Sequence, residues 1–330
     1  MKHAIRLLSH VLTIALLLSC EEKRPGIGLA LGGGGAKCAS EVGALIAIDE
    51  ANVPIDYIAG SSMGALVGGL YAAGYSGEEI KEMWLTEEWL KLFDRHAIGF
   101  IHGESGSELE RNIFGVIDGY EFEERLRQVL REKGCETFQD LRIPFQCTAT
   151  EVVDDEYLRE YVFQSGDVAT AIRASLSFPA PIAGFPPVLY DGKQFIDGGT
   201  LNNLPVDVVK DMGAKYVIAI DLEMKQRHTI APIMLNGLKL LTHGNGIASR
   251  IGAATNSAWL AHWDIRASDM RHKRNWEMAD VKIKNSRLRN YDILCFDRAD
   301  IEQMIRDGKQ AMKDQIYKVS DLLLEQAQEQ

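Results

Sequence analysis

The stretch IGLALGGGGAKC at residues 27–38 decides the fold. Its first five residues form a short apolar run that stops at four glycines, which is typical of a buried strand that ends in a tight turn. After it, Val42, Leu45 and Ile46 lie close to helical spacing and predict a helix that ends before Pro54. Consecutive glycines let several backbone N–H groups point at one anion, so the turn is a candidate anion-binding loop.

The residues around the glycine run argue against a nucleotide as that anion. A phosphate-binding P-loop requires Gly-Lys followed by Ser or Thr, but Lys37 follows Ala36 and precedes Cys38. A dinucleotide-binding fingerprint requires a third glycine where Cys38 stands. A tetrahedral oxyanion, of the kind formed during ester hydrolysis, is the remaining interpretation.

A second decisive stretch is DYIAGSSMG at residues 56–64. Its first four residues predict a strand, and the small residues from Ala65 to Ala73 predict a helix after it. The G-x-S-x-G pattern between them has the form of a nucleophile elbow, in which Gly60 and Gly64 avoid clashes and the tight turn exposes the Ser62 hydroxyl. Two successive strand-helix units also indicate a parallel sheet.

The remaining chain continues this alternation. We expect irregular structure at 94–118 and a proline-rich irregular wall at 178–187. Further strands are predicted at 143–150, 157–164, 195–199, 216–220 and 279–283, and further helices at 77–92, 120–133, 167–174, 230–241, 247–263 and 299–325.

A third motif, Asp197-Gly198-Gly199, places an acid at the end of a predicted strand. Together the three motifs resemble the patatin-like phospholipase family over about residues 27–221, and FDRAD at 296–300 resembles the tail of its bacterial members. The segments 171–175 and 203–206 support the resemblance. It implies an α/β fold of three layers, with a central, mostly parallel sheet flanked by helices and a helical C-terminal extension.

The resemblance also implies roles for the motif residues. Ser62 would be the nucleophile and Asp197 its general base, without a metal or cofactor, and the substrate would be a lipid or phospholipid ester. The other implied site residues are the oxyanion-hole residues Gly33, Gly34, Gly35 and Lys37 and the turn-forming residues Gly60, Gly64, Gly198 and Gly199.

Two residues depart from the family pattern: Lys37 stands where the family usually has Arg, and Cys38 stands where it has Gly. Cys38 leaves a catalytically silent lipid-binding or scaffold lipoprotein as one alternative. A Ser-His-Asp α/β-hydrolase is another, because four histidines follow Asp197. It is disfavoured because only one strand-helix unit precedes the elbow. The histidines concerned are His228, His243, His262 and His272.

The N-terminal stretch MKHAIRLLSHVLTIALLLSC has the shape of a secretion signal over residues 1–19, with a basic start and an apolar run. Leu17-Leu18-Ser19-Cys20 resembles the lipobox of bacterial lipoproteins. We therefore expect an acylated Cys20, a tether at 20–26, and a protein anchored in the bacterial cell envelope, at the outer membrane or periplasmic face.

The net charge of the chain argues against some classes of binding partner. The 330-residue chain carries 36 basic and 47 acidic residues, a net charge of −11, and without residues 1–19 it has 34 basic residues and a net charge of −13. Such a surface repels nucleic acids and anionic lipids, so membrane contact depends on the anchor.

The domains expected after the tether are a catalytic domain at 27–221 and a mainly helical region at 222–330. No Cys-x-x-Cys spacing occurs, and free, mostly buried thiols are expected.

Overall fold

The computed structural model describes residues 26–92, 119–153, 157–178, 187–222, 265–293 and 295–329. Several expectations fall outside these ranges: the signal sequence at 1–19, Cys20 and nearly all of its tether, the segment 94–118, most of the proline-rich stretch 178–187, and the helices predicted at 230–241 and 247–263.

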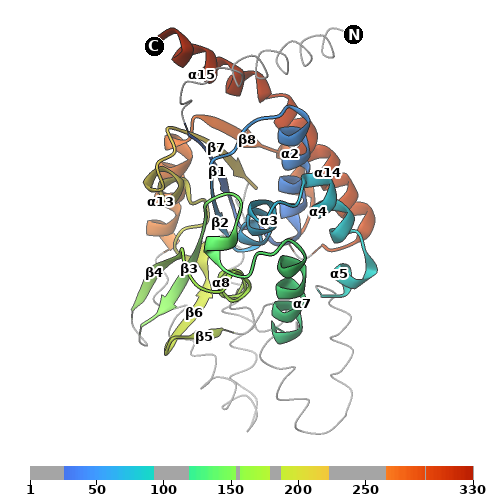
Figure 1. The fold of residues 1–330 in the computed structure, drawn as a ribbon, viewed down its shortest axis with the longest axis vertical. Helices are drawn as coiled ribbons and strands as arrows, with labels where there is room; N and C mark the ends of the chain where they lie inside the picture. The colour runs from blue at the N-terminus through green and yellow to red at the C-terminus, as the bar shows by residue number, and fades with distance from the viewer. Residues whose placement is uncertain are drawn as a thin grey trace, which may run out of the picture.

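One eight-stranded sheet forms the centre of the molecule (Figure 1). Its strand order is β5-β6-β3-β2-β1-β7-β8. Strand β4 pairs with the side of β3 opposite β2 and β6. The strands are β1 (Ile27–Leu31), β2 (Tyr57–Ser61), β3 (Phe145–Val152), β4 (Leu158–Phe163), β5 (Val188–Tyr190), β6 (Lys193–Asp197), β7 (Tyr216–Asp221) and β8 (Val281–Lys284).

The sheet is parallel in its central part and antiparallel at one side. The pairs β1–β2, β1–β7, β2–β3 and β7–β8 are parallel. The pairs β3–β4, β3–β6 and β5–β6 are antiparallel. The carboxyl ends of β1, β2, β7 and β8 therefore lie at the same edge of the sheet, where loops can carry chemistry.

Helices cover both faces of the sheet. Those of more than one turn are α2 (Ala39–Glu50), α3 (Met63–Ala72), α4 (Gly77–Trp84), α5 (Glu87–Leu92), α7 (Gly119–Glu132), α8 (Val168–Ser175), α9 (Val206–Asp211), α13 (Ile265–Met278), α14 (Arg298–Lys313) and α15 (Ile316–Glu329). Single 3₁₀ turns are η1 (Gly35–Cys38), η3 (Phe138–Asp140), η4 (Gly198–Thr200) and η5 (Ser286–Asn290).

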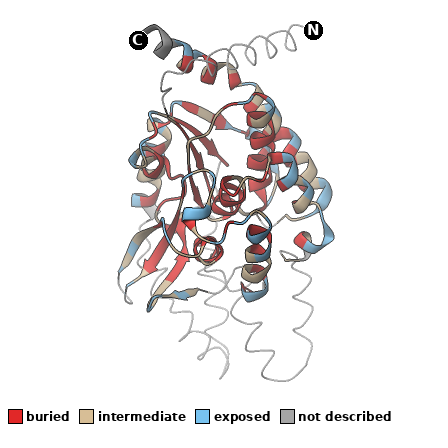
Figure 2. Ribbon diagram, in the orientation of Figure 1, coloured by how far each residue is buried: buried red, intermediate tan, exposed pale blue. Residues whose placement is uncertain are grey.

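Side-chain alternation in the central strands creates two cores. In β1, Leu29 and Leu31 join a large core that includes residues of α2, α3, α8 and α14. Ala30, on the opposite face of the same strand, packs in a smaller core with residues of α9 and α13. Figure 2 shows the buried strands between helices whose outer sides are exposed. The expected three-layer α/β fold is confirmed.

The C-terminal part of the chain packs closely on the N-terminal part. Helix α14 lies beside α2 (Figure 1). At their contact, a Cβ on Gly43 would lie 1.9 Å from the Ile305 carbonyl oxygen, and one on Gly308 would lie 1.9 Å from that of Ser40. Glycine at both positions therefore allows the two backbones to meet.

Element boundaries differ from the predictions where a cap or a tertiary contact ends a helix. The helix predicted at 77–92 is two helices, because the Thr86 hydroxyl accepts the Trp89 N–H and starts α5. The C-terminal helix also breaks, between Lys313 and Ile316. Helix α13 and the short strand β5 were not predicted. The four described cysteines are free and three are buried, as expected.

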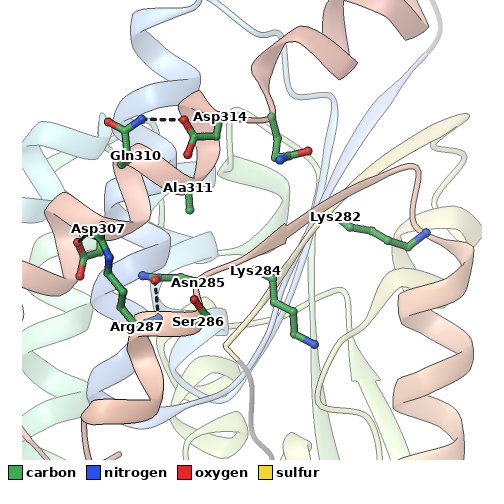
Figure 3. A pocket seen from close by; sticks show the side chains of 10 residues that line it. Lys282, Lys284, Asn285, Ser286, Arg287, Asp307, Gln310, Ala311 and Asp314 are labelled. Carbon is green, nitrogen blue, oxygen red and sulfur yellow. Dashed lines mark hydrogen bonds and ion pairs between the residues drawn. The ribbon is translucent and has the colours of Figure 1, made fainter. Parts of the chain in front are cut away.

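A polar hollow of about 300 Å³ lies between β8, η5 and α14 (Figure 3). Lys284, Asn285, Arg287, Asp307 and Gln310 are among the residues that line it, and no residue of the three sequence motifs does.

Across the described residues, no helix combines the length and apolar character required to cross a bilayer.

Candidate active site

Strand β3 brings the serine motif and the aspartate motif together. β4 occupies one side of β3, so β2 and β6 lie end to end along the other side. Ser61, the last residue of β2, pairs with Thr148, and Asp197, the last residue of β6, pairs with Ala149. Because β2 runs parallel and β6 antiparallel to β3, their carboxyl ends meet head-on. Ser62 and Asp197 are therefore neighbours, although 135 positions separate them in the chain.

Ser62 has the backbone conformation of a nucleophile elbow. Its φ and ψ angles are 53° and −131°, an unfavourable combination for a residue with a side chain, and α3 begins at the next residue. The half-buried side chain donates a hydrogen bond from Oγ to Asp197 Oδ2 at 2.6 Å. The N-terminus of α3 also places the positive end of a helix dipole at Ser62.

Asp197 is 3% exposed, and both of its carboxylate oxygens accept hydrogen bonds. Oδ1 accepts the Gly199 N–H at 2.7 Å, so Oδ2 is directed at Ser62. The Asp197 carbonyl oxygen accepts a hydrogen bond from the Thr150 hydroxyl at 3.0 Å, which holds the end of β6 against β3. The carboxylate is therefore held in one orientation before any substrate arrives.

The glycines of the two motifs lie where side chains would not fit. A Cβ would come within 3.0 Å of Gly64 and Ala65 atoms at Gly60, and of Leu31 and Gly32 atoms at Gly64. It would come within 3.0 Å of Thr148 atoms at Gly198, and of Asn203 and Asp197 atoms at Gly199. At Gly64 the obstructing atoms are the carbonyl oxygens of Leu31 and Gly32, so the elbow packs directly against the start of the glycine loop.

The glycine loop contacts Ser62 through Gly33. A Cβ on Gly33 would lie 2.7 Å from the Ser62 Cβ and 2.6 Å from Asn203 Oδ1. The Gly33 N–H donates to the Asn203 carbonyl oxygen at 3.2 Å, and Asn203 Nδ2 donates to the Gly33 carbonyl oxygen at 2.9 Å. Of the three predicted oxyanion-hole amides, Gly33 therefore already has an acceptor. Among the described residues, no backbone carbonyl oxygen accepts from the N–H groups of Gly34 and Gly35.

The far end of the loop is fixed by the C-terminal region. Gly35 has a φ of +57°, and its neighbour Ala36 donates its N–H to the Ile293 carbonyl oxygen at 2.7 Å. That oxygen would lie 2.1 Å from a Cβ on Gly35, so only glycine fits there. Lys37, predicted to assist the oxyanion, is 1% exposed.

Cys38 does not distort the loop. Its φ and ψ angles are −63° and −12°, an ordinary helical conformation that any residue adopts. The thiol donates to the Gly32 carbonyl oxygen at 3.5 Å inside the core. The residue that departs from the family pattern therefore occupies a position that does not require glycine.

A buried carboxyl lies in the first turn of α2, close to Cys38. Glu41 is 0% exposed, and its carboxyl group lies close to the Cys38 thiol and the Gly32 backbone amide. Burial, with the charge of Asp221 as a smaller contribution, raises the pKa of Glu41 well above its usual value. Its sequence position, before a run of helical apolar residues, gives no sign of this burial.

The histidine that the structure describes contacts a different aspartate from the one in the Asp-Gly-Gly motif. His272, the histidine that the described ranges contain, lies on α13 with Nε2 3.4 Å from Asp221 Oδ1. It helps to hold the pKa of Asp221 below its usual value. His228, His243 and His262 lie outside the described residues.

Two further residues contact the motifs through hydrogen bonds that sequence reasoning did not identify. Ser175 Oγ accepts the Ser62 backbone N–H at 2.8 Å, and Asn203 holds Gly33 as described above. Both lie in segments that support the family resemblance. Their partners are 113 and 170 positions away in the chain, so no local pattern indicates the contacts.

Comparison with known proteins agrees with the motifs. Lysophospholipase NTE1 of Meyerozyma guilliermondii is 34% identical over 212 residues, which are 64% of this chain and 13% of that protein. The human patatin-like phospholipase domain-containing protein 6 is 34% identical over 199 residues, 59% of this chain and 13% of that protein. The chain thus spans about an eighth of the length of these curated relatives.

The structure of VipD from Legionella pneumophila aligns with 91% of this chain and 67% of that chain, at 16% identity and a TM-score of 0.45. The sequence model of the family described as patatin-like phospholipase matches residues 29–210, more than half of the chain, and includes all three motifs. The chain therefore belongs to the patatin-like phospholipase family.

Proposed function

We propose that this protein is a serine-dependent lipid acyl hydrolase in which Ser62 is the nucleophile and Asp197 is its general base. The observation that carries the proposal is the 2.6 Å hydrogen bond from Ser62 Oγ to Asp197 Oδ2. A direct bond of this length leaves no space for an imidazole between the two side chains, which argues against a Ser-His-Asp triad.

The geometry supports a two-step covalent mechanism. Ser62 Oγ attacks the ester carbonyl carbon while its proton passes to Asp197 Oδ2. The negative charge that forms on the carbonyl oxygen is stabilised by the N–H groups of Gly34 and Gly35 and by the N-terminus of α3. When the tetrahedral intermediate collapses, Asp197 returns the proton to the leaving alcohol. Water then attacks the acyl-enzyme while its proton passes to Asp197, and Asp197 returns that proton to Ser62 Oγ as the bond between Oγ and the acyl group breaks and the fatty acid leaves.

The substrate class is proposed from the relatives, which are named lysophospholipase and patatin-like phospholipase. We assign a glycerophospholipid or a lysophospholipid to this site. The chain has a net charge of −11, so the enzyme would reach a lipid surface through an anchor and apolar contacts rather than through charge attraction.

The anchor is proposed from the sequence alone. Cys20 follows an apolar run, and acylation there would tie the protein to the bacterial cell envelope, at the outer membrane or periplasmic face. A diacylated N-terminus provides stable attachment without basic residues.

The test compares hydrolysis of a short-chain nitrophenyl ester and of a lysophospholipid by the full chain with that by Ser62→Ala and Asp197→Asn. We expect both variants to lose at least about 10³-fold in kcat. A fluorophosphonate should label the wild type at Ser62 and should not label Ser62→Ala.

Matched controls are Ser61→Ala, a buried serine beside the nucleophile, and Asp191→Asn, an exposed turn residue. Both should hydrolyse at the wild-type rate. If the wild type and both active-site variants are equally slow, the hydrolase proposal fails, and the silent lipid-binding scaffold takes its place.

A further inference from the structure

The C-terminal end of α8 contacts both residues of the proposed dyad. Ser175, the last residue of α8, accepts the Ser62 N–H through Oγ at 2.8 Å. Ser177 accepts the Asp197 N–H through its backbone oxygen at 2.9 Å. Ser175 and Ser177 are both 0% exposed. A segment of three residues therefore holds the backbone of the nucleophile and of the base.

Ser62 needs such support because its backbone is strained. A residue with a side chain holds a φ of 53° and a ψ of −131° only where its surroundings enforce them. With β2 and α3 held in place on either side, φ of Ser62 relaxes through rotation of the Ser61–Ser62 peptide plane, which would turn the Ser62 N–H away from Ser175 and break their hydrogen bond. The buried hydroxyl of Ser175 therefore favours the strained state over the relaxed one.

The support is itself firmly held. Arg173, 3% exposed, donates from Nη1 to Ser177 Oγ at 2.7 Å and from Nε to the Gly119 carbonyl oxygen at 3.2 Å. Ser177 Oγ in turn donates to the Arg173 carbonyl oxygen at 3.0 Å. These bonds tie the end of α8 to the start of α7, so Ser175 presents its hydroxyl at a fixed place.

We propose that Ser175 is a positioning residue that holds Ser62 in its attack-ready conformation. It touches no reacting atom and acts only through the Ser62 backbone amide. The proposal rests on the proposed function, because it assigns a role in the same reaction. In this proposal, the strained backbone at Ser62 depends on the Ser175 hydroxyl, which comes from a helix that carries none of the three motifs.

The test compares Ser175→Ala and Ser175→Cys with Ser61→Ala. Ser61 is also 0% exposed and lies next to Ser62, but its Oγ has no hydrogen-bond partner among the described residues. For Ser175→Ala we expect kcat and the rate of fluorophosphonate labelling to fall together by about 10- to 100-fold, with KM changed less than about 2-fold. Ser175→Cys should be intermediate, because a thiol is a weaker acceptor. Ser61→Ala should match the wild type.

Thermal unfolding of each variant separates positioning from folding. A folded Ser175→Ala that is labelled as fast as Ser61→Ala overturns the proposal. If Ser175→Ala does not fold, Ser175→Cys tests the proposal instead. Fluorophosphonate labelling of Ser175→Cys at the wild-type rate then overturns the proposal.

A failure of the proposed function has a different signature, since then the wild type is neither labelled nor active. In that case the crystal structure of Ser175→Ala, or of Ser175→Cys if the first variant does not fold, tests the positioning role directly. A φ of Ser62 that relaxes to a negative value supports the role, and a φ that stays near 53° overturns it.

Discussion

Asn203 and Gly33 exchange two hydrogen bonds across 170 positions of the chain: the Gly33 N–H donates to the Asn203 carbonyl oxygen, and Asn203 Nδ2 donates to the Gly33 carbonyl oxygen. This exchange fixes the glycine loop against the segment that follows Asp197. Because the neighbouring amides of Gly34 and Gly35 are the proposed oxyanion donors, Asn203 determines where they point.

Asn203→Asp should therefore lower kcat by about 10- to 100-fold with little change in size, since a carboxylate cannot donate to the Gly33 carbonyl. Ester hydrolysis by the purified variant measures this effect. Asn285→Asp is the control, because Asn285 is also buried but bonds to Ser40 and lies outside the motifs. Equal rates for the two variants would contradict a role for Asn203 in shaping the loop.

Cys38→Gly restores the residue usual in the family, and we expect it to bring no gain in activity. Cys38 already has helical backbone angles, so glycine relieves no strain. The variant loses a buried side chain and gains backbone freedom, which should lower the free energy of unfolding by about 1 to 3 kcal/mol. Urea unfolding and ester hydrolysis measure the two effects. A rise in kcat of tenfold or more would mean that Cys38 impairs the loop.

Glu41 should make stability depend on pH. Burial raises its pKa in the folded protein, so above the ordinary pKa near 4.5 the folded state keeps a proton that the unfolded state has released. Its contribution to the free energy of unfolding therefore falls as pH rises, by about 1.4 kcal/mol for each pH unit, until the folded pKa is reached.

Glu41→Gln removes this titration and keeps the shape of the side chain. The variant should gain stability relative to the wild type between pH 5 and pH 7.5, as measured by urea unfolding at both values. A stability difference that is the same at both pH values would show that Glu41 ionises normally in the folded protein.

Cys20→Ala should release the protein from membranes in a bacterial host that processes lipoproteins. Acyl chains on Cys20 would be the proposed attachment, and the mature chain would carry a net charge of −13 that opposes binding to anionic lipid. Membrane fractionation of the wild type and the variant measures the release. Mass spectrometry of the wild type that finds an unmodified N-terminus at another residue would remove the anchor.

The three motifs could be found in the sequence because each is local. Four glycines after an apolar strand, a serine between two glycines, and an acid before two glycines are complete within a few residues. Their meeting could also be anticipated for β1 and β2, since parallel strands end at one edge. The antiparallel approach of β6, which places Asp197 opposite Ala149, depends on pairing between strands and leaves no local sequence pattern.

The supporting residues could not be found in this way. Ser175 lies in a short helix whose pattern predicts only that one face is buried. Asn203 lies in a loop before a proline, where an asparagine is expected to stabilise a turn. Glu41 has the usual place of an acid in the first turn of a helix and is nevertheless in the core. In each case tertiary contacts determine the role of the residue.

The hydrogen bond from the Ala36 N–H to the Ile293 carbonyl oxygen has a consequence for how this protein can diverge or be re-engineered. The family match ends at residue 210, yet the loop proposed to bind the oxyanion is held by a carbonyl far beyond it. Residues 281–284 also complete the sheet beside β7. A chimaera that exchanged the C-terminal third for that of a relative would keep every motif and still alter the oxyanion loop. If the loop binds the oxyanion as proposed, substitutions in that third are expected to change the rate of hydrolysis without touching a motif residue.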